Sequence, residues 1–376
     1  MTGSWRAGRV LLASSLSLAL AGLWAAPAAA DSVRDRQWHL AALDLPRAHR
    51  ITEGAGVTVA VIDTGVAAQH RDLASAVLRG GSVYPDSTGD GREDVDGHGT
   101  EMAGIIAGRG HGRGGGSGVL GVAPAAKILP IEAPINTFAT ADSIVDAISY
   151  AVDHDADVIN MSFSTANDDR LREAIRAASA AGIVVVAAAG NTGDVDTGDY
   201  PGKFPEVLTV GAVDRRGAVA DYSVRGPQLE IAAPGTEIVT TGIKSSGYCL
   251  CSGTSEAAAV VSGAAALVRA RYPDLSAAEV IHRLTATAVD AGPKGRDDAY
   301  GYGRLDPVRA LTAKVPPLPA GKASASARVR AAPPVDARSM PRSRTAPLVV
   351  TGVAALVVLL VGGLAVWMLL RRRRAR

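Results

Sequence analysis

The sequence predicts an α/β domain in which a mostly parallel sheet is covered by helices on both sides, followed by one carboxyl-terminal transmembrane helix. Short apolar runs rich in β-branched residues alternate with longer stretches of helical character, as in a parallel sheet buried on both faces. Near the end of the chain, residues 348–370 contain no charged side chain. The length of 376 residues and the 47% hydrophobic content allow a large core, and two cysteines exclude a disulfide-dense scaffold.

The individual elements follow from this alternation. Each expected strand is a short apolar run, and the strands are predicted at residues 56–62, 127–132, 157–162, 183–188 and 207–213. The expected helices are longer, and they cover residues 139–153, 169–181, 255–272 and about 276–288. Ser276 is predicted to cap the last helix, because Glu279 follows three residues later. The glycine-rich residues 108–118 are expected to form a flexible surface loop.

Both ends of the chain carry targeting features. Residues 1–30 have a basic start, an apolar run and a small-residue cleavage site, as a secretory signal peptide does. The apolar residues 348–370 are long enough to cross a hydrocarbon core of about 30 Å, and the arginines after them favour the cytoplasm. We therefore expect a single-pass protein of the cell membrane whose main domain is extracellular. The expected order is a signal peptide (1–30), an N-terminal extension (31–55), the main domain (56–313), a Pro/Ala/Arg-rich linker (314–347), the transmembrane helix (348–370) and a cytoplasmic basic tail (371–376).

Three polar residues stand at the ends of predicted elements, with glycine close to each. Asp63 ends the first strand, His98 precedes an apolar helical run, and Ser255 opens the long alanine-rich helix. Functional sites of parallel sheets form beyond the carboxyl ends of the strands. A carboxylate, an imidazole and a hydroxyl in the chain order Asp, His, Ser fit nucleophilic acyl transfer. Taken singly, each residue is more often a turn, structural or capping residue, and the set of three favours catalysis.

The segments around these residues resemble the motifs of subtilisin-family serine proteases. They read VAVIDTGV around Asp63, DGHGTEMAGIIAG around His98 and SGTSEAAAVVSGAAAL around Ser255, and the resemblance extends from residue 54 to residue 311. It implies a three-layer subtilisin-like catalytic domain in which Ser255 is the nucleophile, His98 the general base and Asp63 its orienting carboxylate. It implies a polypeptide substrate. No cofactor is expected, and no metal is expected because the sequence has no Cys/His zinc pattern. The remaining implied site residues are Asn191 as oxyanion donor and Ser162, Phe163, Ser164, Ala189 and Gly190 along the substrate cleft.

The segment 33–40 and the overall layout resemble the mycosins, a group of membrane-anchored subtilisin-like proteases. That resemblance implies association with a type VII secretion membrane complex. An alternative is a structural subunit of that complex whose proteolysis is secondary. Residues 31–55 are too short for a folded inhibitory pro-domain. They are expected to form a strap on the domain surface, and the rival reading is a tethered inhibitor lying in the cleft.

Two local features leave alternatives open. The family usually has Met after the nucleophile, and Glu256 stands there instead. Its carboxylate either raises the pKa of His98 or only supports the first helical turn. Cys249 and Cys251 are one residue apart, and alternate Cα atoms of an extended strand lie almost 7 Å from each other. Two free thiols, a strained internal bridge and a bond to a partner all remain open.

The charge pattern argues against two other classes of ligand. The 39 basic residues nearly balance the 37 acidic ones, so no nucleic-acid partner is expected. Asp86, Asp90, Asp94 and Asp96 lie in a glycine-rich loop before His98. Their spacing does not match an EF-hand, and a solvated loop is favoured over a calcium site.

Overall fold

A computed structural model describes residues 33–135, 140–192 and 200–318 of the chain. The described residues all belong to one compact unit. The predicted signal peptide, the predicted transmembrane helix, the basic tail and most of the linker lie outside them. Within the described ranges, no helix has both the length and the apolarity needed to cross a membrane.

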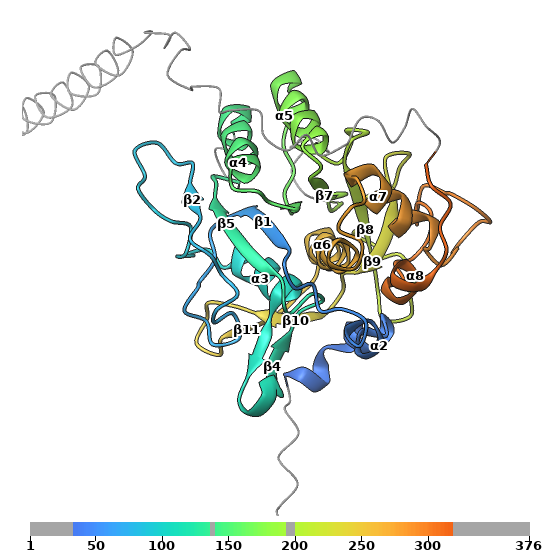
Figure 1. Ribbon diagram of the computed structural model, residues 1–376, viewed down its shortest axis with the longest axis horizontal. Coiled ribbons are helices and arrows are strands. Elements are labelled where there is room, and N and C mark those ends of the chain that lie inside the picture. Colours follow the sequence, from blue (N-terminus) through green and yellow to red (C-terminus); the bar gives the residue numbers. More distant parts are fainter. Residues whose placement is uncertain (1–32, 136–139, 193–199, 319–376) are drawn as a thin grey trace, which may run out of the picture. The chain divides into compact units, whose positions relative to one another are not determined.

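The central sheet has seven strands, and every neighbouring pair in it is parallel (Figure 1). In spatial order, the strands are β2 (Gly81–Ser82), β5 (Lys127–Glu132), β1 (Thr58–Asp63), β6 (Val158–Met161), β7 (Val184–Ala188), β8 (Leu208–Val213) and β9 (Ile231–Pro234). On one side of β1 lie β5 and then β2. On its other side lie β6, β7, β8 and β9, in the order in which they occur in the chain. The carboxyl end of β1 therefore lies where the strand order reverses, which is where ligand sites form in such sheets.

Separate groups of helices cover the two faces of the sheet (Figure 1). Along β1, Val59 and Val61 belong to one core cluster and Ala60 and Ile62 to the other, because successive side chains of a strand point to opposite faces. The first cluster contains side chains of α3 (His98–Ala107), α6 (Thr254–Arg271), α7 (Ala277–Ala286) and α8 (Pro307–Thr312). The second contains side chains of α4 (Ala141–Asp153) and α5 (Asp169–Ala180).

Helix α6 is buried around almost its whole circumference, since it lies between the sheet and α3. Its alanines, valines and glycine leave room for this close packing. A Cβ atom on Gly263 would stand 2.6 Å from the Cβ of Val122, so a larger residue does not fit there. The alanine-rich composition of this segment thus serves packing, and it holds the amino end of α6 against the sheet.

The five predicted strands and the four predicted helices are all present, with ends that differ by at most two residues from the prediction. The predicted cap of α7 is confirmed: Ser276 and Glu279 form a capping box in which Ser276 N donates to Glu279 Oε2 over 2.8 Å. Helix α5 is capped by Asp168, whose carboxylate accepts a hydrogen bond from Arg170 N over 2.8 Å.

Residues 108–118 form no flexible loop, and that prediction is wrong. They contain β3 (Arg109–His111) and the start of β4 (Ser117–Leu120), which pair as an antiparallel hairpin. Long-range bonds hold this hairpin in place: Arg34 Nε donates to Gly118 O over 2.8 Å, and Val119 N donates to the buried Asp72 over 2.8 Å. A second hairpin, β10 (Ile238–Thr241) with β11 (Tyr248–Cys251), was not predicted.

The N-terminal extension packs on the domain surface through η1 (Arg34–Arg36), α1 (Trp38–Ala42) and α2 (Leu45–His49). Gln37 bonds both backbone groups of Leu120 in β4, over 3.0 and 2.9 Å. Trp38 Nε1 donates to Thr236 O over 3.1 Å. Leu45 is fully buried in the first core cluster. These contacts are those of a surface strap, and none of the partners belongs to the predicted triad.

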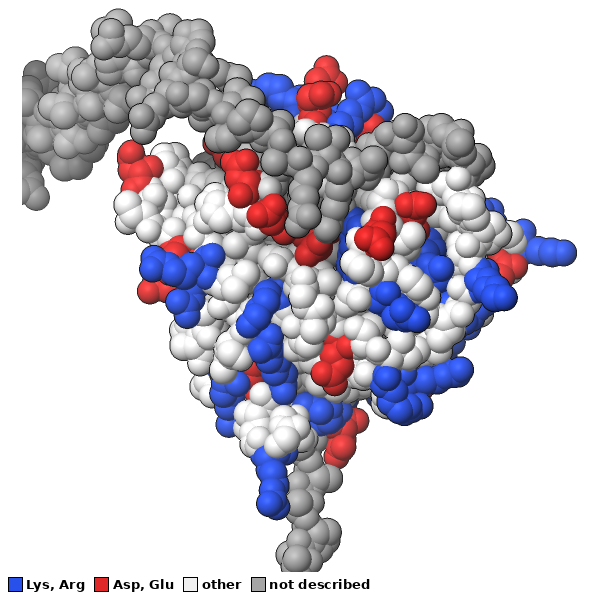
Figure 2. Space-filling view, viewed as in Figure 1, with Lys and Arg blue, Asp and Glu red and all other residues white. Residues whose placement is uncertain are grey.

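Positive and negative side chains are interspersed over the face shown in Figure 2. Helix α5 provides an example, because Arg176 and Arg172 both reach Glu206, over 2.8 and 3.5 Å. Exposed pairs of this kind contribute about 0–1 kcal/mol each. The surface charges therefore add little to the stability of a fold that rests on its two apolar clusters.

Candidate active site

The carboxylate of Asp63 and the imidazole of His98 form a hydrogen-bonded pair at the carboxyl end of β1. His98 Nδ1 lies 2.8 Å from Asp63 Oδ1 and 3.0 Å from Oδ2. Asp63 is fully buried, whereas 26% of the His98 side chain is exposed. Asp63 Oδ1 also accepts a hydrogen bond from Thr64 N over 2.8 Å. The buried carboxylate thus fixes the orientation of the ring and leaves Nε2 for chemistry.

The approach of α3 to β1 depends on glycine and on Asp94. A Cβ atom on Gly99 would collide with the carbonyl oxygen of Gly65, so only glycine allows the helix to begin this close to the strand. Asp94 Oδ2 accepts bonds from Thr100 N and Thr100 Oγ1, over 2.9 and 2.6 Å. Asp94 Oδ1 accepts one from Thr64 Oγ1 over 3.0 Å. Asp94 therefore joins the turn after β1 to the first turn of α3, a role the sequence reasoning missed.

Ser255 lies in the first turn of α6, and its hydroxyl donates to the carbonyl of Ser162 over 3.0 Å. A buried network beneath it holds α6 against β6. Asn160 Nδ2 donates to Ser162 Oγ over 2.9 Å, and Ser262 Oγ donates to Asn160 Oδ1 over 2.9 Å. Sequence reasoning did not find this network, because its members are far apart in the chain.

Asn191 lies beside the same helix end. Its Oδ1 accepts hydrogen bonds from Thr254 N and Thr254 Oγ1, over 3.0 and 3.2 Å. In the described residues, its Nδ2 donates no hydrogen bond, and it lies 3.7 Å from the position of a Cβ on Gly253. The oxygen of the amide is thus tied to α6, which leaves the nitrogen as a donor near Ser255.

The residues expected along the cleft have different surroundings. Ser162 is 3% exposed and contacts Ser255, and Gly190 N donates to Thr254 Oγ1 over 3.1 Å, so both lie at the amino end of α6. Phe163 and Ala189 are 7% and 1% exposed, and the Phe163 side chain belongs to the second core cluster. Ser164 is partly exposed. Phe163 therefore packs its ring into the core and does not present it to solvent.

Two further carboxyl groups, those of Glu101 and Glu256, act on His98 electrostatically. Burial lowers the pKa of His98, but the charge and hydrogen bond of Asp63, together with Glu256 and Glu101, raise it to about 10. Burial and the nearby Glu256, Asp63 and Asp94 raise the pKa of Glu101 to about 7, against the effect of His98. Burial also raises the pKa of Glu256, which is 4% exposed. Both readings of Glu256 have support, because it raises the pKa of His98 and also lies in the first turn of α6, where a hydrogen bond from its own backbone acts to lower its pKa.

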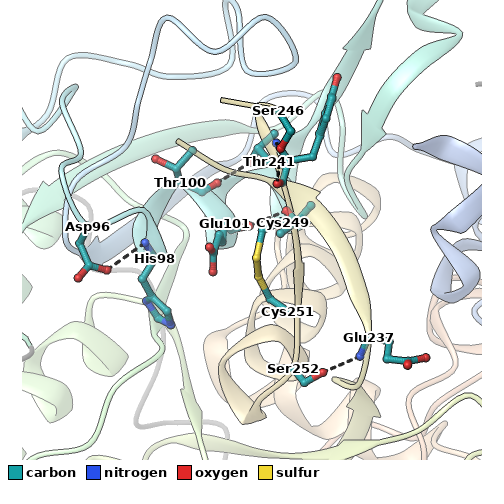
Figure 3. The surroundings of a disulfide bond; sticks show 12 residues. Asp96, His98, Thr100, Glu101, Glu237, Thr241, Ser246, Cys249, Cys251 and Ser252 are labelled. Carbon is teal, nitrogen blue, oxygen red and sulfur yellow. Dashed lines mark hydrogen bonds between the residues drawn. A yellow bond between two sulfur atoms is a disulfide. The ribbon is translucent and has the colours of Figure 1, made fainter. Parts of the chain in front are cut away.

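Cys249 and Cys251 form a disulfide within β11, with their Cα atoms 5.8 Å apart. Of the alternatives open from the sequence, the internal bridge is the one found. Figure 3 shows the Glu101 side chain between His98 and this bridge. The Glu101 carboxylate and the two sulfur atoms lie within 4.8 Å of one another, but the sulfurs are bonded to each other and are not free to bind a metal.

The profile of the subtilase family matches residues 54–303, which include all of this site. The chain belongs to the subtilase family of serine proteases. This subtilase is 35% identical to mycosin-1 of Mycobacterium tuberculosis over 98% of its own length and 90% of that protein. It is 40% identical to subtilisin DY of Bacillus licheniformis over 67% of its own length and 89% of that protein. A solved structure of the MycP3 protease from the type VII (ESX-3) secretion system covers 74% of the subtilase, at 37% identity and a TM-score of 0.63.

Proposed function

We propose that this subtilase is a serine endopeptidase that cleaves polypeptides through an acyl-enzyme, with Asp63, His98 and Ser255 as its catalytic residues. The observation that carries the proposal is the buried Asp63 carboxylate bonded to His98 Nδ1 over 2.8 Å, on a helix that packs against the helix bearing Ser255. This is the arrangement that turns a serine hydroxyl into a nucleophile.

The steps follow from the positions of these groups. Ser255 Oγ attacks the peptide carbonyl carbon while its proton passes to His98 Nε2. The Asp63 carboxylate stabilises the imidazolium that forms, and His98 then gives the proton to the leaving amine. Asn191 Nδ2 and the backbone N–H of Ser255, at the amino end of α6, donate hydrogen bonds to the oxyanion. Water attacks the acyl-enzyme by the reverse sequence of proton transfers.

One contact must change before the first step. The Ser255 hydroxyl donates to Ser162 O over 3.0 Å in the free protein, so its side chain has to rotate toward His98 when a substrate binds. Catalytic hydrogen bonds are often long or differently directed in free enzymes and form in the substrate complex. The Ser162 carbonyl thus holds the nucleophile in a resting position.

The substitution Ser255→Ala tests the assignment. Hydrolysis of a fluorogenic peptide by the purified domain should fall by about 10⁵–10⁶-fold, because removing the nucleophile disables the whole catalytic unit. Ser252→Ala is the matched control, since Ser252 lies three residues away and its hydroxyl accepts a hydrogen bond from Glu237 N over 2.8 Å. Unchanged hydrolysis by a folded Ser255→Ala protein would refute the assignment.

We further infer that this subtilase works beside a type VII secretion membrane complex, anchored to the membrane by residues 348–370. The similarity to mycosin-1 over 98% of the chain and the origin of the MycP3 structure support this context. The uncharged run 348–370, followed by arginines, supports the anchor.

Gentle detergent extraction and affinity purification of the full chain should recover secretion components in defined ratio. Recovery of the protease alone under conditions that preserve the complex would contradict this context. A Ser255→Ala chain that still supports secretion would favour the structural alternative.

A further inference from the structure

The Cys249–Cys251 disulfide takes no part in the steps proposed above, yet it lies directly before the nucleophile in the chain. Cys251 is the last residue of β11, and Ser255 follows it by four residues. The two sulfur atoms and the Glu101 carboxylate lie within 4.8 Å of one another. Figure 3 shows the Glu101 side chain between the bridge and His98. The bridge is therefore close to both helices that carry the reacting side chains.

The hairpin that contains the bridge is fixed to α3. Thr240 Oγ1 donates to Glu101 O over 2.8 Å, and Thr241 Oγ1 donates to Thr100 O over 2.6 Å. Both threonines are fully buried in β10, and Thr240 pairs directly with Cys249 in β11. One side of the bridge thus has a fixed position relative to the first turn of α3.

On its other side, the bridge leads into a tightly held segment that ends at the nucleophile. Ser252 Oγ accepts a hydrogen bond from Glu237 N over 2.8 Å, and Gly253 N donates to Gly235 O over 2.9 Å. Helix α6 begins with the next residue, and its second residue is Ser255. Because the connection is this short and is bonded on both residues, a displacement of β11 is passed on to the nucleophile.

The bridge sets the length of β11. Its two Cα atoms lie 5.8 Å apart, whereas alternate Cα atoms of an extended strand lie up to about 6.8 Å apart. Reduction of the S–S bond therefore allows Cys249 and Cys251 to separate by about 1 Å. A misplacement of about 1 Å near a catalytic group can lower a rate by about 10²-fold. The position of Ser255 thus depends on the closed bridge.

A cross-link of this span adds little to global stability. It closes a loop with only Leu250 between its cysteines, and the entropy that a disulfide removes from the unfolded chain increases with loop length. Leu250 is 58% exposed and both cysteines are partly exposed, so the bridge is not sealed from solvent. The chain contains no third cysteine, so reduction gives two thiols and no rearranged bridge. These features favour a local, reversible role.

We propose that the Cys249–Cys251 bridge is a thiol-sensitive switch that positions Ser255. The protease is active while the bridge is closed, and it loses most of its turnover when a low-molecular-weight thiol opens the bridge. This inference rests on the proposed endopeptidase function and names a regulation of that same site. Disulfides form in oxidising compartments and not in the cytoplasm, so the closed, active form belongs to the exported chain.

The opening of the bridge is an ordinary thiol–disulfide exchange. A thiolate attacks one sulfur atom, the S–S bond breaks, and the other sulfur leaves as a thiolate that takes up a proton. A second thiol then attacks the mixed disulfide and releases the second cysteine. Two thiol molecules leave as one disulfide, and the protein gains two electrons and two protons.

Hydrolysis of a fluorogenic peptide by the full chain in detergent micelles tests the switch. The oxidised protein would be compared with the same protein after treatment with dithiothreitol, and a thiol-reactive dye would verify that the bridge has opened. Reduction should lower kcat by about tenfold or more and change KM by less than about threefold, because the bridge acts on the nucleophile and not on substrate binding. Removal of the reductant and addition of oxidised glutathione should restore the original kcat.

Variants of β11 show whether the bridge is responsible. The double variant Cys249→Ser with Cys251→Ser should have the kcat of the reduced protein and should not respond to dithiothreitol. Leu250→Ala is the matched control, because it changes the exposed residue between the cysteines and leaves the bridge intact. It should keep both the wild-type kcat and the full response. Melting curves of each protein verify that a lost kcat is not lost folding.

The outcomes separate the switch from the proposed chemistry. Equal kcat in the oxidised and the reduced protein, or a response to dithiothreitol that persists in the double variant, would overturn the switch and leave the endopeptidase assignment intact. A loss of activity that accompanies unfolding and is not reversed by oxidised glutathione would also overturn it, because the bridge would then only stabilise the fold. Hydrolysis that persists in Ser255→Ala would overturn the endopeptidase assignment itself, and with it a switch that acts through Ser255.

Discussion

At the scale of single residues, the pH dependence of catalysis is set by the carboxylates around His98. His98 has to be neutral to accept the proton of Ser255, and its pKa is raised to about 10 by Asp63, Glu256 and Glu101 against the effect of burial. The acid limb of kcat/KM for a neutral peptide should therefore lie well above pH 6.5. Glu101→Gln and Glu256→Gln each remove a charge that raises this pKa, so each should shift the limb to lower pH by about one unit. A wild-type limb at or below pH 6.5, or one that neither variant moves, would contradict this.

Asn191 allows a second test at the same scale. If its Nδ2 donates to the oxyanion, Asn191→Ala should lower kcat by about 10²–10³-fold with a smaller effect on KM, because that bond forms only in the transition state. Thr192→Ala is the neighbouring control, since among the described residues its hydroxyl donates only to the carbonyl of Asp221, over 3.5 Å. A loss of less than about fivefold in Asn191→Ala would leave Asn191 as a structural anchor of Thr254.

The sequence predicted the reacting side chains better than it predicted the side chains that position them. Asp63 and His98 were named from element ends and glycine motifs, and their hydrogen bond is present. Asp94 and Asn160 were not assigned a positioning role, because each acts through partners brought near by tertiary packing. The sequence feature that could have indicated this role of Asp94 is its position four residues before His98, because an acidic residue is favourable near the start of a helix. The pairing of Cys249 with Cys251 depends on how far the strand contracts, which the sequence does not state.

At the scale of elements, the strap formed by residues 33–52 should respond to acid. His39 in α1 is fully buried, neither of its ring nitrogens has a hydrogen-bond partner, and burial lowers its pKa from 6.5 to about 4. Below pH 6.5 the unfolded chain binds a proton at this site that the folded chain resists. The free energy of unfolding should therefore fall as pH decreases from 6.5 toward 4, by at most about 3 kcal/mol.

The substitution His39→Leu isolates this effect. Between pH 7.5 and pH 4.5, the melting temperature of the variant should decrease less than that of the wild type, since the variant has no buried imidazole to protonate. His154→Leu is the control, because that histidine lies on the exposed end of α4. Identical acid sensitivity in the wild type and His39→Leu would show that the strap is held by its other contacts, such as those of Gln37 and Trp38.

The elements that the sequence predicted correctly are those with strong local patterns. Strand β7 is a continuous apolar run, and α7 has a complete capping box. By contrast, β2 contains two residues and pairs only with β5, and β9 is recognisable only because it pairs with β8. The hairpin of β3 and β4 was predicted as a loop because its sequence is rich in glycine and has no strand pattern. Its strand pairing is stabilised by Arg34 and Asp72, which lie in distant parts of the chain.

At the scale of the whole molecule, the membrane anchor is expected to be separable from the catalytic domain. A chain ending after Ala346 lacks the uncharged run 348–370, so it should fractionate with soluble proteins and keep its peptidase activity. The full chain should remain with the membrane after a high-salt wash, which removes proteins held only by charge. Membrane association of the shortened chain after that wash would point to a second anchor or a tightly bound partner.

The overall α/β architecture was predictable because strand and helix patterns alternate along the chain, and parallel sheets follow from that alternation. The surroundings of Ser255 were not. The bond to Ser162 O and the acidic groups near His98 arise where α3, α6 and β6 meet, and no local pattern encodes that meeting.

The most direct test of the central claim is to locate the reactive serine chemically. The purified domain would be treated with a fluorophosphonate, digested and mapped by mass spectrometry. We predict one adduct per chain on Ser255, slowed by an added peptide substrate and lost in His98→Ala, because the hydroxyl reacts only when His98 takes its proton. A domain that cleaves peptides without labelling, or that is labelled at a different residue, would contradict the assignment of Asp63, His98 and Ser255 as the catalytic unit.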